Sequence, residues 1–357
     1  MNPDESLESV RADQPASMLR DDGDGGSSAW SVAPAVQRGP HVGPEFDSMI
    51  DLASRVIADS THLHRVAHYT SSIHDFGVDV LDDPALSRSD DERPIATRRA
   101  GYLRGGQSLT FIVGQEDAEL QKLRSGRMIR TVLHSDRGAI FCAPVRRGEY
   151  LTGLSLDDTR TAVDAADLTL AELVTAIRGQ VGLGSQNPGG WLTARPSESD
   201  VWLGPIRSQA GDESFEFCGE ENRAMTGLFR GAVGREHLHY VATYRSGVMA
   251  SSADCLDDPS IRHLFTQMTP GARRREYGEV GERFKSLAEK FGQLMRMAVK
   301  GHLVRVVFDV EQGAIYYYRL PGDGYMIGVT LVQAQVNAAD HRMAELAGEY
   351  VRLIGSC

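Results

Sequence analysis

The chain carries one stretch twice, HLHRVAHY at residues 62–69 and HLHYVATY at residues 237–244, and this repeat decides the predicted fold. The same offset of 175 residues carries LDDP at 81–84 onto LDDP at 256–259, and the two segments align without a gap from residue 62 to residue 156. Roughly a quarter of the aligned positions are identical, against about one in sixteen for unrelated segments of average composition. An internal period of domain size predicts a duplicated domain and not a solenoid.

The bulk composition limits the classes of function. The chain has 357 residues, of which 41% are hydrophobic and 24% charged, and this is enough for two domains with a core each. The formal net charge of −11 argues against a general affinity for nucleic acids. No apolar run is long enough to span a membrane, no secretory signal is present, and the four cysteines form no CxxC pair. We therefore expect a cytoplasmic protein with reduced thiols.

Composition also divides the chain into four parts. Residues 1–43 are rich in Asp, Gly, Ser and Pro without an apolar period, which predicts a disordered acidic tail. Residues 44–178 and 219–357 form the first and second repeats. Residues 179–218 between them are rich in Gly, Pro and Ser and predict a linker.

Hydrophobic periodicity predicts the same order of elements in both repeats: a helix, two strands, a middle segment, three strands and a closing helix. In the first repeat these elements are expected at 46–57, 63–69, 77–81, 128–134, 139–143, 150–156 and 162–177. In the second they are expected at 222–233, 238–244, 248–253, 303–309, 314–318, 325–331 and 336–354. The middle segment of the second repeat predicts a helix over 279–300, but that of the first is ambiguous because Gly105 and Gly106 interrupt it. The Asp-Asp-Pro steps are expected to cap helical turns.

The last part of the second repeat carries a family resemblance. DVEQGAIY at 309–316 leads into GDGYMIGV at 322–329, and AAD at 338–340 and MAEL at 343–346 follow. These segments, together with the order of elements, resemble the Roadblock/LC7 domain, which has a profilin-like fold. The first repeat departs from the pattern, since Arg147-Gly148-Glu149 replaces Gly-Asp-Gly.

The resemblance implies an α/β (α+β) sandwich with two homologous domains, each with a five-stranded antiparallel sheet flanked by helices. It also implies a pseudo-dimer within one chain, because Roadblock domains usually act as dimers that bind small GTPases or scaffold signalling complexes. A related α/β sandwich of the PAS or GAF type, which senses a small ligand, is the alternative.

Two groups of residues are candidates for a site. His62 with His64, and His237 with His239, have the spacing that places two imidazoles on one face of a strand, where they could bind a metal in a hydrolase. A half-exposed strand face without metal is the simpler interpretation of these histidines.

The second group is a cluster of cationic and aromatic residues that both repeats share: Arg98, Arg99, Tyr102, Arg273, Arg274 and Tyr277. Guanidinium groups bind phosphates and carboxylates in a fork, and aromatic neighbours are common at interfaces, so this cluster is the candidate partner-binding surface.

No phosphate loop, GxSxG or HExxH motif occurs in the chain. We therefore expect no catalytic residue and no cofactor. The hypothesis from sequence is a non-catalytic regulatory or scaffold protein that binds a signalling protein, of which a small GTPase is one example.

Overall fold

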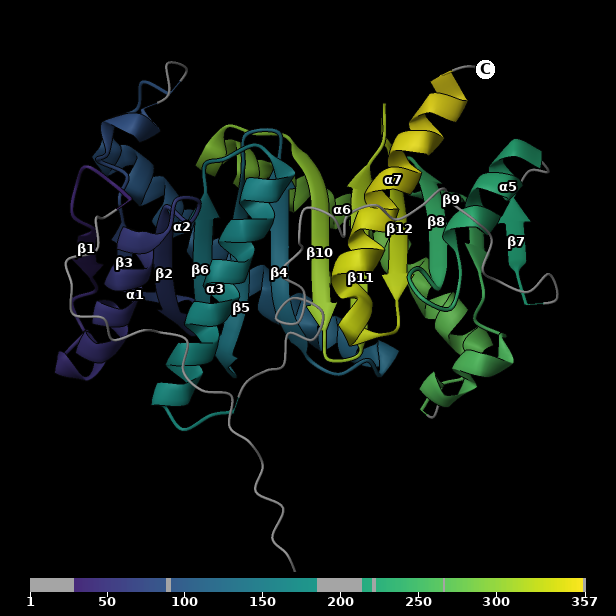
Figure 1. The fold of residues 1–357 in the computed structure, drawn as a ribbon, viewed down its shortest axis with the longest axis horizontal. Helices are drawn as coiled ribbons and strands as arrows, with labels where there is room; N and C mark the ends of the chain where they lie inside the picture. The colour runs from purple at the N-terminus through teal and green to yellow at the C-terminus, as the bar shows by residue number, and fades with distance from the viewer. Residues whose placement is uncertain (1–28, 88–90, 185–213, 220–222, 266, 356–357) are drawn as a thin grey trace, which may run out of the picture.

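The computed structural model describes residues 29–87, 91–184, 214–219, 223–265 and 267–355. The protein is an α/β structure built on one antiparallel sheet of twelve strands, with helices on both faces (Figure 1). None of the described helices is long and apolar enough to cross a membrane.

The first half of the chain contains six strands and three long helices: β1 (Ala35–Arg38), α1 (Asp47–Asp59), β2 (Arg65–Thr70), β3 (Ile73–Asp79), α2 (Ile95–Leu120), β4 (Met128–Ser135), β5 (Gly138–Arg146), β6 (Glu149–Ser155) and α3 (Arg160–Gln180). The second half repeats the order: β7 (Glu216–Gly219), α5 (Arg223–Ala232), β8 (Tyr240–Arg245), β9 (Val248–Asp254), α6 (Pro270–Val299), β10 (Leu303–Val310), β11 (Gly313–Arg319), β12 (Gly324–Thr330) and α7 (Val336–Gly355). The strands and closing helices predicted from periodicity are therefore present near their expected bounds.

The strand order is the same when it is counted inward from either edge of the sheet. The order is β1-β3-β2-β6-β5-β4-β10-β11-β12-β8-β9-β7, so that strands at equivalent positions in the two halves occupy equivalent places. The sequence led us to expect two separate five-stranded sheets. Instead β4 and β10 pair antiparallel at the centre, with Val132 opposite Val307, and join both sets of strands into a single sheet.

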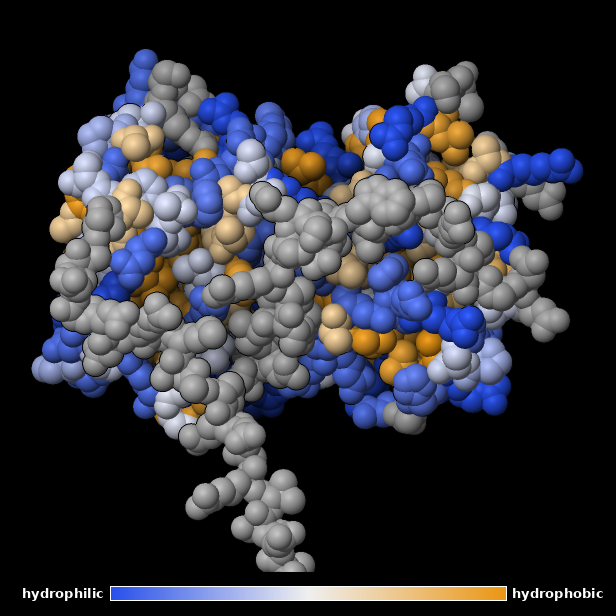
Figure 2. Space-filling model, viewed as in Figure 1, coloured by the Kyte–Doolittle hydropathy of each residue, from blue (hydrophilic) through white to orange (hydrophobic). Residues whose placement is uncertain are grey.

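Helices cover the two faces of this sheet in separate layers. α1, α3, α5 and α7 lie on the face toward the viewer in Figure 1, and α2 and α6 lie behind the sheet. α2 and α6 run antiparallel, because Arg283 of α6 pairs with Glu119 near the end of α2 while Arg93, just before α2, donates to the carbonyl of Met297 near the end of α6. On the front face, small apolar areas lie between larger hydrophilic ones where the described residues are visible (Figure 2).

The Asp-Asp-Pro steps cap helical turns as expected. The Asp83 carboxylate accepts a 2.8 Å bond from the Ala85 amide, and Asp258 accepts a bond of the same length from the Ser260 amide. Both turns are short 3₁₀ helices, η2 (Pro84–Leu86) and η4 (Pro259–Leu264).

The ambiguous middle of the first half is a continuous helix, α2. Gly105 and Gly106 do not break this helix, and Gly106 makes room for a tyrosine from the sheet: a Cβ at Gly106 would lie 2.0 Å from the hydroxyl oxygen of Tyr69. The second half repeats this contact, with a Cβ at Gly281 at the same distance from the hydroxyl of Tyr244. These glycines therefore serve close packing of the helix against the sheet.

Two predicted irregular segments contribute edge strands. The predicted tail ended at residue 43, but β1 lies within it and pairs with β3, and the indole of Trp30 donates to the carbonyl of Ser60 at 2.8 Å. The end of the predicted linker, residues 216–218, likewise forms most of β7, which pairs with β9. Short edge strands have no periodic signal of their own, since their partner supplies the hydrogen bonds. Residues 1–28 of the tail and 185–213 of the linker lie outside the described residues.

Substituting Gly106 by Ala should destabilise the fold by about 1–3 kcal/mol, because the added methyl group overpacks the contact with Tyr69. The matched control is Gly105→Ala. No heavy atom lies within 4 Å of a Cβ at Gly105, so this change should be neutral or stabilising by up to about 1 kcal/mol. Urea denaturation of both variants measures the difference, and equal effects would contradict this account of α2.

Candidate functional site

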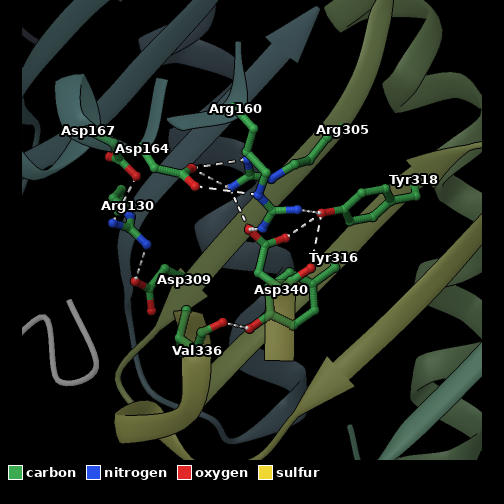
Figure 3. A network of polar contacts seen from close by, with 10 residues as sticks. All are labelled: Arg130, Arg160, Asp164, Asp167, Arg305, Asp309, Tyr316, Tyr318, Val336 and Asp340. Carbon is green, nitrogen blue, oxygen red and sulfur yellow. Dashed lines mark hydrogen bonds and ion pairs between the residues drawn. The ribbon is translucent and has the colours of Figure 1, made fainter. Parts of the chain in front are cut away.

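A network of buried charged side chains lies where the two halves meet (Figure 3). Arg130 of β4 stands opposite Asp309 of β10 in the sheet register, and their charged groups are 3.0 Å apart. Arg130 also lies 3.0 Å from the carboxylate of Asp167 on α3. One guanidinium thus connects the closing helix of the first half to the central strand of the second.

Arg305, at the position equivalent to Arg130, forms the other side of this network. It reaches Asp340 of α7 at 2.5 Å and Asp164 of α3 at 3.3 Å. Arg160 of α3 also binds Asp340 at 2.7 Å, and the hydroxyl of Tyr318 donates to Asp340 at 2.8 Å. We call the boundary between the two halves, where β4 pairs with β10, the seam. Carboxylates of α3 and α7 each pair with an arginine of the other half across this seam (Figure 3).

The charges of the network do not balance when every group is ionised. The residues in Figure 3 include three arginines and four aspartates, which leaves one excess negative charge. Burial raises the pKa of Asp167 to about 7 against the opposing effect of Arg130, and burial raises that of Asp309 to about 6. For Asp340 burial acts in the same direction, but Arg305 and Arg160 outweigh it and hold the pKa below its ordinary value. A proton shared near Arg130 would neutralise the network.

The network is not symmetric, and one departure from symmetry involves a histidine. His134 occupies the place in β4 that Asp309 occupies in β10, and it faces Arg305 across the seam. Burial, assisted by Arg305, lowers the pKa of His134 to about 4, so that the imidazole is neutral at pH 7. Sequence analysis missed this network, although the equivalence of Arg130 and Arg305 under the 175-residue offset was a signal.

His64 and His239 are buried and each accepts a backbone amide, so they do not lie on the half-exposed strand face that we expected. Nδ1 of His64 accepts the amide of Leu156 at 3.0 Å, and Nδ1 of His239 accepts the equivalent amide of Leu331 at 3.2 Å. These lone pairs are therefore not available to a metal. His62, which precedes β2, forms a 2.8 Å hydrogen bond with the carboxylate of Asp157. Burial lowers the pKa of His237.

The cluster of arginines and tyrosines lies mostly inside the molecule. Arg98, Tyr102, Arg273 and Tyr277 are buried, so the structure does not present them as the surface that we expected. The reason is the helical spacing of these residues, which turns them toward the sheet, while the adjacent Arg99 and Arg274 bind carboxylates at the ends of β3 and β9.

Arg99 and Arg274 make equivalent ion pairs. Arg99 lies 2.6 Å from both Asp79 and Asp82, and Arg274 lies 2.7 Å from Asp254 and 2.8 Å from Asp257. Glu216 of β7 joins the second group. These three acids are the one set in the described part of the chain whose ligand atoms are close enough for a metal, and all three already pair with the guanidinium of Arg274.

A second buried cluster is confined to the first half. His68 lies between Asp75 at 2.7 Å and Glu149 at 3.0 Å. Burial opposes protonation, but the bonds to the two carboxylates raise the pKa of His68 above its ordinary value. The equivalent positions in the second half hold Thr243, Ala250 and Gly324, so the repeat offered no signal for this cluster.

Two large apolar side chains are exposed on neighbouring segments of the first half. Ile73, the first residue of β3, and Phe111 of α2 are each 58% exposed, and their neighbours Ser72 and Thr110 are joined by a 3.1 Å hydrogen bond. We call these two side chains the Ile73–Phe111 patch. In the second half Val248 is also exposed, at 69%, but Ser286 replaces the phenylalanine.

A scan of models of known protein families finds none that matches this sequence, and a search of curated proteins finds no relative.

Replacing Asp167 by Asn tests the proton balance of the network. The raised pKa means that the folded chain binds this proton more tightly than the unfolded chain, so the carboxyl contributes most to stability below about pH 4 and less as the pH rises to 7. The Asn side chain does not titrate, so the variant does not lose stability in this way as the pH rises. Its free energy of unfolding relative to wild type should therefore rise by about 1–2 kcal/mol from pH 5 to pH 8, measured by chemical denaturation.

Arg130→Met is the companion to Asp167→Asn, and its effect on stability with rising pH should have the opposite direction. It leaves Asp167 and Asp309 without their shared cation and should cost about 3–5 kcal/mol, more at pH 8 than at pH 5. Parallel pH profiles for wild type and Asp167→Asn would contradict the assignment of the proton to this site.

Proposed function

We propose that the chain is a duplicated Roadblock-like protein that acts without catalysis, as a cytoplasmic regulator or scaffold. Its two halves would form a pseudo-dimer, and its partner would be a signalling protein. A small GTPase is the partner class that the family resemblance implies.

The observation that carries this proposal is the mirrored strand order about β4 and β10. In a two-fold dimer the same surface of each subunit contacts its counterpart, so that equivalent strands pair antiparallel at the centre. β4 and β10 are equivalent under the 175-residue offset and pair in this way, and Arg130 and Arg305 lie on the two sides of the pairing. This arrangement supports the proposed pseudo-dimer, in which two subunits would follow one another in one chain.

The Ile73–Phe111 patch supports a protein as the partner. Exposed apolar side chains mark interaction sites where they form a contiguous patch, and aromatic residues contribute strongly to binding energy at interfaces. The equivalent position to Phe111 is Ser286, so the two halves offer different surfaces. One partner per chain, bound at the first half, follows from this difference.

If the pairing of β4 with β10 takes the place of a contact between two chains, the purified chain should be monomeric. The outer strands β1 and β7 have four residues each, which offers little edge for pairing with another sheet. Light scattering after size-exclusion chromatography should give the mass of one chain over a wide concentration range. A stable two-chain species would contradict the proposed pseudo-dimer.

Substituting Phe111 by Glu should remove partner binding. A tagged full-length chain is incubated with native lysate that contains GDP or a non-hydrolysable GTP analogue, and bound proteins are quantified by mass spectrometry. Wild type should enrich a signalling protein, and the variant should retain roughly one tenth of it or less, as expected when an interface anchor is replaced by a charge.

Ser286→Glu is the matched control, because it places the same charge at the equivalent position of the second half. This variant should bind like wild type. Equal loss with both variants, or no enriched protein with wild type, would overturn the proposed binding surface. A nucleotide-dependent difference in the captured protein would identify a small GTPase.

A further inference from the structure

A cavity in the first half lies beside the turn between β5 and β6. Its volume is about 550 Å³, within the range that small-molecule sites occupy. The end of α2, the start of β4, the β5–β6 turn, the end of α3 and the β10–β11 turn form its walls. We call it the arginine cavity.

The walls of the arginine cavity carry more positive than negative charge. Four guanidinium groups face two carboxylates, in a chain whose overall charge is −11: Arg127, Arg146, Arg147 and Arg178 against Asp117 and Glu311. Both carboxylates already accept backbone amides, Asp117 from Met128 at 2.7 Å and Glu311 from Arg127 at 3.2 Å. The excess positive charge is therefore concentrated around one hollow.

The four guanidinium groups differ in how they are held. Arg146 pairs with Glu149, and Arg178 donates to the carbonyls of Val145 and Gly184. The side chains of Arg127 and Arg147 are exposed and make no ion pair within the described part of the chain. Two guanidinium groups are thus oriented by the protein and two can reach a ligand.

Part of the wall is not charged. Val113, Met128 and Ile129 are buried apolar residues at the cavity, and the ring of Tyr150 lies beside them. Such a wall suits the organic body of a ligand, while the guanidinium groups suit an anionic group at its end.

The equivalent cavity in the second half has a different character. Its volume is about 280 Å³, and His302 and Gly322 stand at the positions of Arg127 and Arg147. His302 is already bonded to Asp136 at 3.1 Å. Tyr325, equivalent to Tyr150, stacks on Tyr244 and donates to the carbonyl of Gly281 at 2.9 Å. The scaffold is common to both cavities. Arginines at the positions of Arg127 and Arg147 occur only in the first cavity, while Arg296 and Arg319 line other positions of the second.

We propose that the arginine cavity binds a small organic phosphate. Arg127 and Arg147 would contact the phosphate oxygens, because a guanidinium group matches them with two parallel hydrogen bonds and keeps its charge at all physiological pH values. Arg146 and Arg178 would add positive potential from fixed positions. This site is independent of the protein partner proposed above.

Isothermal titration calorimetry of the full-length chain tests the proposal with four probes: inorganic phosphate, pyrophosphate, ADP and citrate. One site per chain is expected, with ADP or pyrophosphate bound most tightly and citrate, which carries only carboxylates, bound more weakly. Tight binding of citrate with no binding of the phosphates would overturn the assignment of the ligand class. No heat with any probe at millimolar concentration would overturn the site itself.

A double variant, Arg127→Ala with Arg147→Ala, should weaken binding by roughly tenfold or more, since each lost bond to a charged group is worth about that factor. Arg296→Ala with Arg319→Ala makes the same change of charge at the second cavity and should leave affinity within about twofold. Equal losses in both double variants would show general charge attraction and overturn the site. Unchanged thermal unfolding of the unliganded variants excludes a loss of fold as the cause.

Discussion

The pairing of β4 with β10 is the contact on which the rest of the structure depends. It joins the strands of the two halves into one sheet and places α3 beside the strands of the second half. Without it each half would expose a central strand with unpaired backbone groups, which is costly and promotes aggregation. The seam also fixes which surfaces of the halves face the same side of the molecule.

Buried charges at the seam constrain how the halves can meet. Arg130 and Arg305 each need carboxylates, and the structure supplies them from α3, α7 and β10. Desolvation makes such a network a weak source of stability, but a shift of the strand register would leave a buried charge without its partner. The network therefore selects one register, while apolar residues such as Val132 and Val307 supply the burial.

The two halves share their framework and differ in the groups placed on it. His64 and His239 accept equivalent amides, and Gly106 and Gly281 admit equivalent tyrosines. The His68 cluster, Phe111 and the arginine cavity occur in the first half, where the second half has smaller or already paired side chains. The contacts that hold the framework together are thus the same in both halves. The features that suggest binding occur where the two halves differ in sequence.

The sequence by itself determined the repeat, most strands and helices and the Asp-Asp-Pro caps, because these depend on apolar spacing and on contacts between near neighbours. Only the tertiary structure decided that two sets of strands form one sheet, that Arg98 and Arg273 are buried, and that Arg130 meets Asp309. It also decided that β1 and β7 are strands. Such features arise from side chains and edges brought together from distant parts of the chain, and local patterns carry no information about their partners.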